Sequence, residues 1–397
     1  MSSVLDLPAV AAADPRLAPV DAVLSAAHAH QQIVGAVVLV RRHGQLVHAS
    51  ASGWADREER RSMSRDALFR LASVSKPIVT AAAMRLVAQG LLALDAPITD
   101  WLPDFRPALA DGRRPDITLR HLLSHSAGLG YRFLDADADG PHARAGVSDG
   151  MDDSPVSLRE NLRRIARVPL LFAPGTAWRY ALGVDVAGAL LEAATGVPLA
   201  QLVREQVSLP LGMQDTGFHT DSPARLVTPY VTDTPQPHRL AEGEVVAPFE
   251  GSAGIRYSLA RASDPAAFAS AGGGMVGTAD DVMRLLEALR GESRRDWLPA
   301  TAVAAMARAQ VGEQAPPDAP GWGFGLGFAV LDDAGPTATP QAPGSWRWGG
   351  AYGHSWFVDP ARGLSVVALT NTLYEGMHGA FVDHLRDAVY AALEVSA

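Results

Sequence analysis

The sequence predicts an α+β fold, in which one antiparallel sheet is built from both ends of the chain and a mainly helical domain is inserted between them. Strand-like apolar runs occur near the amino terminus and again in the last third of the chain, whereas helical patterns dominate the middle. Helices gathered around an antiparallel sheet bury the apolar faces of both. We therefore expect an α/β domain of residues 1–88 and 265–397 and an inserted helical domain of residues 89–264.

The amino-terminal elements are a helix followed by a hairpin. An amphipathic pattern predicts a helix over residues 17–33, and the apolar run 34–40 predicts a buried strand. His43 and Gly44 turn the chain into a second strand over residues 46–49.

The central region is predicted to be helical with long connections. A short helix begins at His121, and a longer one runs from about Gly183 to Ala194. Residues 135–155 are polar and rich in Asp, Gly and His, which predicts a long surface loop. Proline and glycine are frequent over residues 212–271, so this segment is expected to wrap the surface or to line a cleft.

The carboxy-terminal part is predicted to supply most of the sheet. Thr278 opens a helix that runs through Leu289, and a last helix covers about residues 379–393. Between these helices the pattern predicts four strands, at residues 323–330, 345–350, 354–358 and 364–369.

Composition limits the classes of partner. The chain has 397 residues, a formal net charge of -9 and no block of like charges, so we expect small-molecule partners and neither nucleic acid nor a membrane. The lack of cysteine excludes disulfides and thiolate chemistry. The first residues do not resemble a secretory signal and no apolar run is long enough to span a bilayer, which predicts a cytoplasmic protein. The oligomeric state is left open.

The candidate chemistry centres on Ser73 and Lys76. The chain has 34 Lys and Arg residues, of which Lys76 is the only lysine. An amine can lose its proton and act as a base, whereas a guanidinium stays charged. Ser73 lies three residues earlier on the same helix face, which places a nucleophile beside a base. Ser73 is also predicted to be the helix N-cap, with Pro77 in the first turn.

The same four residues have a less specific interpretation. S-x-x-K is a weak pattern on its own, and an N-cap serine beside a solvated lysine would produce it. The single lysine favours the catalytic interpretation.

Two further segments offer what serine acylation requires beyond a nucleophile and its base. A turn at Pro174 and Gly175 precedes Tyr180, whose phenol can relay a proton. Gly349 and Gly350 end a predicted strand, where a ligand can approach the backbone closely.

These motifs together resemble the serine β-lactamase and penicillin-binding-protein superfamily, and within it the family VIII carboxylesterases, which look like class C β-lactamases. Ser73 to Lys76 matches S-x-x-K, Tyr180 to Leu182 stands where the lactamases have Y-x-N, and Trp348 to Gly350 stands where they have K-T-G. The resemblance covers almost the whole chain. It implies the β-lactamase/transpeptidase-like fold, with the active site between the α/β domain and the inserted helical domain.

The resemblance also implies roles for single residues. Ser73 would be the nucleophile, Lys76 and Tyr180 would share the work of general base and proton relay, and the backbone N–H groups of Ser73 and Ala351 would form the oxyanion hole. No metal or cofactor is implied. The residues expected to line the substrate pocket are Trp348, Gly349, Gly350, Leu182, Tyr131, Trp178 and His354; core packing is an equal alternative for Tyr131 and Trp178, and His354 alone would be a strand-end histidine.

Departures from the family pattern separate an esterase from a lactamase. Trp348 stands in place of the K-T-G lysine that helps to hold a carboxylate, and Leu182 stands in place of the Y-x-N asparagine. Both changes favour uncharged esters with short acyl groups. The resemblance leaves room for removal of the acetyl ester from cephalosporins.

Other candidate sites are less well supported by the sequence. Gly146 to Gly150 matches G-x-S-x-G, but a polar segment precedes it where a nucleophile elbow needs a strand, so Ser148 is expected in a surface turn. His121 and His125 stand four apart without the glutamate of a zinc motif, so packing and capping are favoured over zinc.

We therefore predict a serine carboxylesterase that works through an acyl-enzyme. The enzymatic alternatives are a β-lactamase, a D-alanyl-D-alanine peptidase or an amide hydrolase on the same fold. A catalytically silent ligand-binding module is the alternative of another class.

Overall fold

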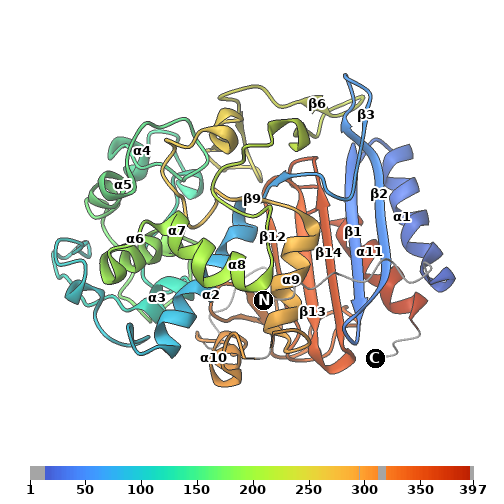
Figure 1. The fold of residues 1–397 in the computed structure, drawn as a ribbon. Coiled ribbons are helices and arrows are strands. Elements are labelled where there is room, and N and C mark those ends of the chain that lie inside the picture. Colours follow the sequence, from blue (N-terminus) through green and yellow to red (C-terminus); the bar gives the residue numbers. More distant parts are fainter. Residues whose placement is uncertain (1–13, 295, 312–318, 394–397) are drawn as a thin grey trace.

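The fold is an eight-stranded antiparallel sheet with helices on both faces, as predicted (Figure 1). The computed structural model describes residues 14–294, 296–311 and 319–393; residues 1–13, on which the predicted absence of a signal rests, lie outside this range. The strand order is β10-β11-β12-β13-β14-β1-β2-β3. The strands of this sheet are β1 (Gly35–Arg42), β2 (Gln45–Asp56), β3 (Arg61–Ser62), β10 (Trp322–Phe324), β11 (Ala329–Leu331), β12 (Trp346–Gly350), β13 (His354–Asp359) and β14 (Leu364–Thr370).

The two ends of the chain meet in the middle of the sheet. β1 pairs with β14 in a register that places Val38 opposite Ala368. Successive residues of β1 point to opposite faces, and Val37 and Val38 are both fully buried because helices cover both faces. A run of apolar residues is therefore what this central strand requires.

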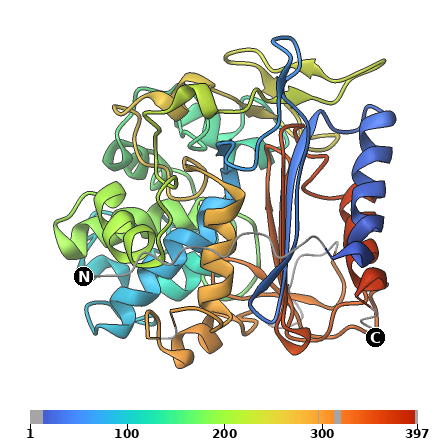
Figure 2. The same cartoon turned by 45° about the vertical axis from the view of Figure 1, so that its right-hand side comes forward.

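The helices form two layers around the sheet. α1 (Ala18–Ala29) and α11 (Ala380–Ala392) lie side by side on one face, as Figures 1 and 2 show. α2 (Ser75–Ala88) and α9 (Ala279–Leu289) lie on the other face. Thr278 caps α9 by accepting a hydrogen bond from the backbone N–H of Asp281, which is the start that the sequence predicts.

The remaining helices gather beyond α2. α6 packs against α2, α3 and α5, and one continuous apolar core extends from β1 through α2 into α6. The predicted domain limits stay a prediction. These helices are α3 (Leu119–Leu123), α4 (Pro141–Arg144), α5 (Leu158–Ile165), α6 (Gly183–Thr195), α7 (Leu199–Val203), α8 (Leu209–Leu211) and α10 (Ala300–Met306).

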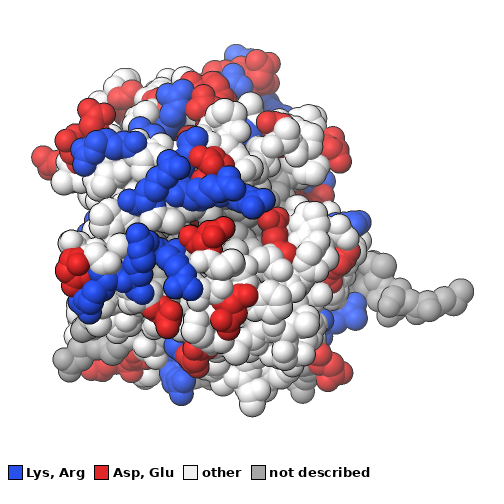
Figure 3. Space-filling view, turned by 90° about the vertical axis from the view of Figure 1, so that its left-hand side faces the viewer, with Lys and Arg blue, Asp and Glu red and all other residues white. Residues whose placement is uncertain are grey.

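Within the described ranges, no single helix is long and apolar enough to cross a membrane. Among these residues, α6 and the following segment Leu199–Leu211 are long and apolar enough only when they are taken together, and they are bent by 88° relative to each other. On the side of the molecule that carries α3 and α5, acidic and basic side chains lie among one another (Figure 3). Glu160 of α5, for example, pairs with Arg164.

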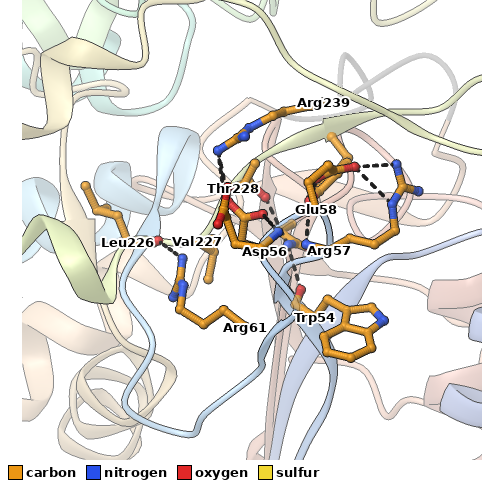
Figure 4. A network of polar contacts seen from close by, with 12 residues as sticks. Trp54, Asp56, Arg57, Glu58, Arg61, Leu226, Val227, Thr228 and Arg239 are labelled. Carbon is orange, nitrogen blue, oxygen red and sulfur yellow. Dashed lines mark hydrogen bonds and ion pairs between the residues drawn. The ribbon is translucent and has the colours of Figure 1, made fainter.

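The segment from 212 to 271 wraps over one end of the sheet, as predicted. It forms short hairpins, and a polar network ties it to the end of β2 (Figure 4). There Thr228 and Arg239 both donate to the Asp56 carboxylate, and Arg61 donates to the Leu226 carbonyl at 2.6 Å. The short strands of this region and its neighbours are β4 (Phe69–Arg70), β5 (Tyr230–Val231), β6 (His238–Arg239), β7 (Val245–Val246), β8 (Ile255–Arg256) and β9 (Val276–Gly277).

Two local predictions are wrong. Residues 323–330 form parts of two strands rather than one, because the backbone turns at Gly327, whose φ of +87° suits glycine and whose N–H donates to Leu123. Residues 135–155 are not a surface loop throughout. They include α4, and Ser148 and Met151 are buried because neighbouring side chains satisfy the polar groups of this segment.

Candidate active site

Ser73 stands in a tight turn that leads from β4 into α2. The turn is a 3-10 segment, η2 (Ala72–Val74), and Ala72 takes a left-handed φ of 44° although it is not glycine. Such backbone strain persists only where the surrounding structure holds it, here a fully buried site. The prediction of Ser73 as N-cap is wrong: α2 begins at Ser75, because the Ser73 hydroxyl is engaged by other side chains. Pro77 lies in the first turn of α2, as predicted.

The structure brings Ser73, Lys76 and Tyr180 together. A hydrogen bond of 2.5 Å joins Ser73 Oγ to Tyr180 Oη, and Lys76 Nζ donates to Ser73 Oγ at 3.1 Å. Lys76 also donates to the Gly272 carbonyl at 2.7 Å. Its side chain is 1% exposed, so the only lysine of the chain is a buried amine. A hydroxyl with an amine on one side and a phenol on the other is an arrangement for nucleophilic attack with proton transfer.

A buried carboxylate behind Lys76 was missed by the sequence analysis. Asp185 in α6 accepts a hydrogen bond from Ser270 Oγ at 2.7 Å and lies next to Gly272. Burial raises the pKa of Asp185, against the hydrogen bond from Ser270 and the positive charge of Lys76. The available signal was a single charged residue in the apolar stretch from Gly183 to Leu191.

His125 supports Tyr180 from the side. Its Nδ1 accepts a hydrogen bond from the Ala181 N–H at 3.2 Å, and its ring centroid lies 4.7 Å from that of Tyr180. Burial and the nearby charge of Lys76 hold the pKa of His125 well below its ordinary value, so the ring is neutral. His121 accepts from the Thr118 N–H and so caps α3.

No group of three metal-ligating side chains occurs among the described residues. His121 caps α3 and His125 packs on Tyr180, through the contacts described above.

The end of β12 lies against the turn that carries Ser73. A Cβ atom added to Gly350 would stand 2.4 Å from the Leu71 carbonyl oxygen, so only glycine permits this approach. Ala351 follows directly, and both it and Ser73 line the pocket. The backbone of β12 is thereby held beside the nucleophile candidate.

A pocket of about 650 Å³ opens over Ser73. Tyr131, Tyr180, Trp348 and Gly349 are among the predicted residues that line it, and it continues past β12 to α11. The aromatic rings of Tyr180 and Trp348 lie 5.6 Å apart. The wall around Ser73 is thus largely apolar.

Four residues predicted to line this pocket lie outside its lining in the described structure. Leu182 is fully buried, and Trp178 packs on His125. His354 is fully buried, where its Nε2 donates to the Arg70 carbonyl at 2.9 Å, and Gly350 is covered by the Ser73 turn. These residues therefore belong to the packing around the site and not to the pocket wall.

Ser148 is a structural residue of a buried turn. Its hydroxyl donates to Asp152 at 2.7 Å and accepts from the Gly150 N–H at 3.0 Å. The turn is thus buried and not on the surface as predicted. Ser148 has no histidine or lysine partner among the described residues, so nothing there would activate its hydroxyl. The adjacent Asp149 was missed: it accepts from the backbone N–H of Arg132 and Phe133, and burial raises its pKa to about 7.

The profile of the family described as Beta-lactamase matches residues 20–391. The chain belongs to the beta-lactamase family. Within the beta-lactamase family, one relative is the esterase EstB of Burkholderia gladioli, which is 52% identical over 94% of this chain and 95% of its own length. Protein Rv1367c of Mycobacterium tuberculosis is 33% identical over 84% of this chain and 85% of its own.

Solved structures show the same fold. The structure of EstCE1, described as a hydrolase with promiscuous acyltransferase activity, superposes with a TM-score of 0.92 and 48% identity, covering 95% of this chain and 99% of that one. Simvastatin synthase LovD of Aspergillus terreus superposes with a TM-score of 0.74 at 24% identity, over 96% of this chain and 99% of its own. This last likeness concerns the fold alone.

Proposed function

We propose that the protein is a serine carboxylesterase that hydrolyses short-acyl carboxylic esters through a covalent acyl-enzyme. The observation that carries this proposal is the hydroxyl of Ser73, which meets Tyr180 at 2.5 Å and the buried amine of Lys76 at 3.1 Å in the wall of an apolar pocket. The similarity to esterase EstB, at 52% identity over nearly the whole chain, supports the same class of reaction.

In the first half of the reaction, Ser73 Oγ attacks the ester carbonyl carbon. The Lys76 and Tyr180 pair takes the hydroxyl proton and delivers it to the leaving oxygen, so that an alcohol departs and the acyl group stays on Ser73. Gly272 holds Lys76 through its carbonyl and so fixes the amine against Ser73. In the second half, the same pair takes a proton from water, the hydroxide attacks the acyl carbon, and the acid leaves while Ser73 recovers its proton.

The developing negative charge on the carbonyl oxygen needs two donors. We assign this task to the backbone N–H groups of Ser73 and Ala351, because the close approach of Gly350 to Leu71 holds the two segments together. Donors fixed before the reaction stabilise the oxyanion without reorganisation, and one such donor contributes about 10²- to 10³-fold in rate.

The ring of Trp348 argues for a neutral group next to the scissile ester. It packs on Tyr180 and Phe324 and offers no positive charge beside Ser73. A β-lactam or peptide carboxylate would find no cation at this place, which ranks the β-lactamase and the peptidase below the esterase. Acetyl esters carried by cephalosporins remain within the proposed substrate range, and a silent binding module is disfavoured by the complete hydrogen-bonded set.

The test is turnover of p-nitrophenyl butyrate and nitrocefin by the wild type, Ser73→Ala and the control Ser148→Ala. We expect fast ester hydrolysis and negligible nitrocefin hydrolysis by the wild type, no turnover by Ser73→Ala, and activity retained by Ser148→Ala, provided that it folds, since Ser148 only supports a turn. Fast nitrocefin turnover would replace the esterase by a lactamase, and activity that survives in Ser73→Ala would refute the assignment of the nucleophile. A cytoplasmic location and the lack of nucleic-acid and membrane partners stay predictions from the sequence.

A further inference from the structure

The far end of the pocket carries a cation without a counter-ion. Arg347 in β12 lines the same pocket as Ser73, and its guanidinium lies 3.8 Å from the centroid of the Trp322 ring. Within the described ranges, no carboxylate lies close enough to form an ion pair with it, and no oxygen accepts a hydrogen bond from its guanidinium. Burial lowers the pKa of Arg347 to about 10, which leaves it charged at neutral pH. A partly desolvated charge of this kind is stabilised by a ligand of opposite charge.

The neighbouring charges leave Arg347 as the available cation. Arg386 of α11 lines the pocket too, but it donates to Asp383 at 2.9 Å and to Asp387 at 2.8 Å. Asp383 is thus engaged by Arg386 rather than by Arg347. Arg386 lowers the pKa of Arg347 more than Asp383 raises that pKa. Asp383 lines the pocket as well, but it and Asp387 are the carboxylates that Arg386 engages, so Arg347 is the cation at this end that has no ion pair among the described residues.

A second donor without a partner lines the pocket. Gln341 lines it and is 4% exposed, and its Oε1 accepts a hydrogen bond from Thr339 Oγ1 at 2.9 Å. Its Nε2 has no acceptor among the described residues. A buried amide donor without a partner is destabilising by about 1 to 3 kcal/mol, so an acceptor supplied by a ligand would be bound favourably.

We propose that this end of the pocket binds a carboxylate, and that the enzyme prefers esters that carry one remote from the scissile bond. The inference rests on the proposed esterase function and names its substrate class. Trp348 keeps the position beside Ser73 uncharged, whereas Arg347 supplies a charge further along the same strand. Arg347 and Gln341 both line the pocket, and each offers N–H donors that a carboxylate oxygen accepts.

The position of Arg347 along β12 sets a lower limit on the distance between the scissile ester and the carboxylate of the substrate. Arg347 precedes Ala351 by four residues along β12, and its side chain leaves the strand on the face opposite to that of Trp348, toward α11, so the linker must run along the strand and around its edge. Four extended residues alone span about 13 Å, and an extended chain advances about 3.5 Å for three bonds, so the linker between the ester carbon and the carboxylate has on the order of eight bonds or more. Mono-esters of medium-length dicarboxylic acids have this form.

The experiment compares kcat/KM for p-nitrophenyl hydrogen azelate and p-nitrophenyl methyl azelate, which differ only in whether the distal carboxylate is free. We expect the wild type to prefer the free carboxylate by about 10-fold or more, the range of a charge-assisted hydrogen bond. Arg347→Gln should bring this ratio close to one, and Gln341→Leu should lower it. Arg113→Gln, which removes the same charge from an exposed side chain outside the pocket lining, should leave the ratio unchanged.

The outcomes separate this inference from the proposed function. Equal kcat/KM values for the two azelates in the wild type, with p-nitrophenyl butyrate still hydrolysed, would overturn the carboxylate site alone, whether or not the variants fold. A ratio that persists in both Arg347→Gln and Gln341→Leu would also overturn it. Loss of all ester hydrolysis by the wild type would instead refute the esterase proposal.

Discussion

At the scale of single residues, Lys76 is the group on which the mechanism depends. Its amine is buried and donates to both Ser73 and Gly272, so replacement of this lysine by arginine is not conservative. A guanidinium stays protonated and cannot take the proton of Ser73. The chain uses arginine for every other basic residue, which makes the amine at this position informative.

We expect Lys76→Arg to lower kcat for p-nitrophenyl butyrate by about 10³-fold or more, because general base catalysis is lost. Arg113→Lys, a change between the same residue types on an exposed side chain, serves as the control and should leave kcat unchanged. Retention of most of kcat in Lys76→Arg would show that a charge, not an amine, is required.

His354 makes the stability of the fold depend on pH. Burial lowers its pKa to about 4, from an ordinary value of 6.5. As the pH falls, the unfolded chain takes up a proton near pH 6.5 and the folded chain only near pH 4, so stability is fully present above pH 6.5 and is lost between these values. Between about pH 7 and pH 5 this one group lowers the free energy of unfolding by about 2 kcal/mol. His125 shifts in the same direction.

The expected result is a smaller loss of stability on acidification in His354→Phe than in the wild type, although the lost hydrogen bond to Arg70 lowers stability at every pH. The midpoint of urea unfolding at pH 7 and pH 5 measures it. His219→Phe removes a largely exposed histidine and should keep the wild-type dependence. An equal drop in wild type and His354→Phe would mean that His354 does not titrate as described.

At the scale of elements, the contact between β12 and the Ser73 turn holds the backbone donors in place. Gly350 has no room for a side chain, since its added Cβ would stand 2.4 Å from the Leu71 carbonyl oxygen and 3.3 Å from a Val74 methyl group. Any larger residue pushes the strand away from the nucleophile, and the distance between the two proposed oxyanion donors grows.

Gly350→Ala should therefore reduce kcat by about 10²- to 10³-fold, as loss of one oxyanion donor does, with a smaller effect on KM. Gly217→Ala is the control, because its added Cβ meets only the His219 carbonyl oxygen at 3.6 Å. If kcat of Gly350→Ala stayed within a few-fold of the wild type, the backbone of β12 would not take part in the reaction.

Elements that are defined by signals within a few residues can be predicted from the sequence. The hairpin at His43, the helix opened by Thr278 and the strands 354–358 and 364–369 follow from turn residues, caps and apolar patterns, and the structure confirms them. Tyr180 was found only through its motif. Asp185 and the Gly272 carbonyl were not predicted, because the contacts that bring them to Lys76 join residues 85 to 196 positions apart, which no local pattern records.

At the scale of the whole molecule, the pocket is assembled from distant parts of the chain. Ser73 comes from the turn η2 before α2, Tyr180 from the segment before α6, and Trp348 from the sheet. One continuous apolar core joins these parts, so their relative positions are fixed by packing rather than by a hinge. The substrate specificity therefore depends on the way in which the sheet and the helices pack together around the pocket.

Trp348 offers a test of specificity at this scale. In Trp348→Lys a cation returns to the place beside Ser73, so we expect the ratio of nitrocefin to p-nitrophenyl butyrate hydrolysis to rise by about 10-fold or more, the range of a charge-assisted hydrogen bond. Trp101→Lys changes an exposed tryptophan in the same way and should leave the ratio unchanged. An unchanged ratio in Trp348→Lys would remove Trp348 from the account of specificity.

The most direct test of the central claim, an acyl-enzyme on Ser73, is intact-mass spectrometry after treatment with a phosphonate ester inhibitor. We expect a single adduct on the wild type, none on Ser73→Ala, and loss of p-nitrophenyl butyrate hydrolysis in step with adduct formation. Ser148→Ala should form the adduct as the wild type does. An adduct that persists on Ser73→Ala, or one that leaves ester hydrolysis intact, would show that Ser73 does not carry the acyl group.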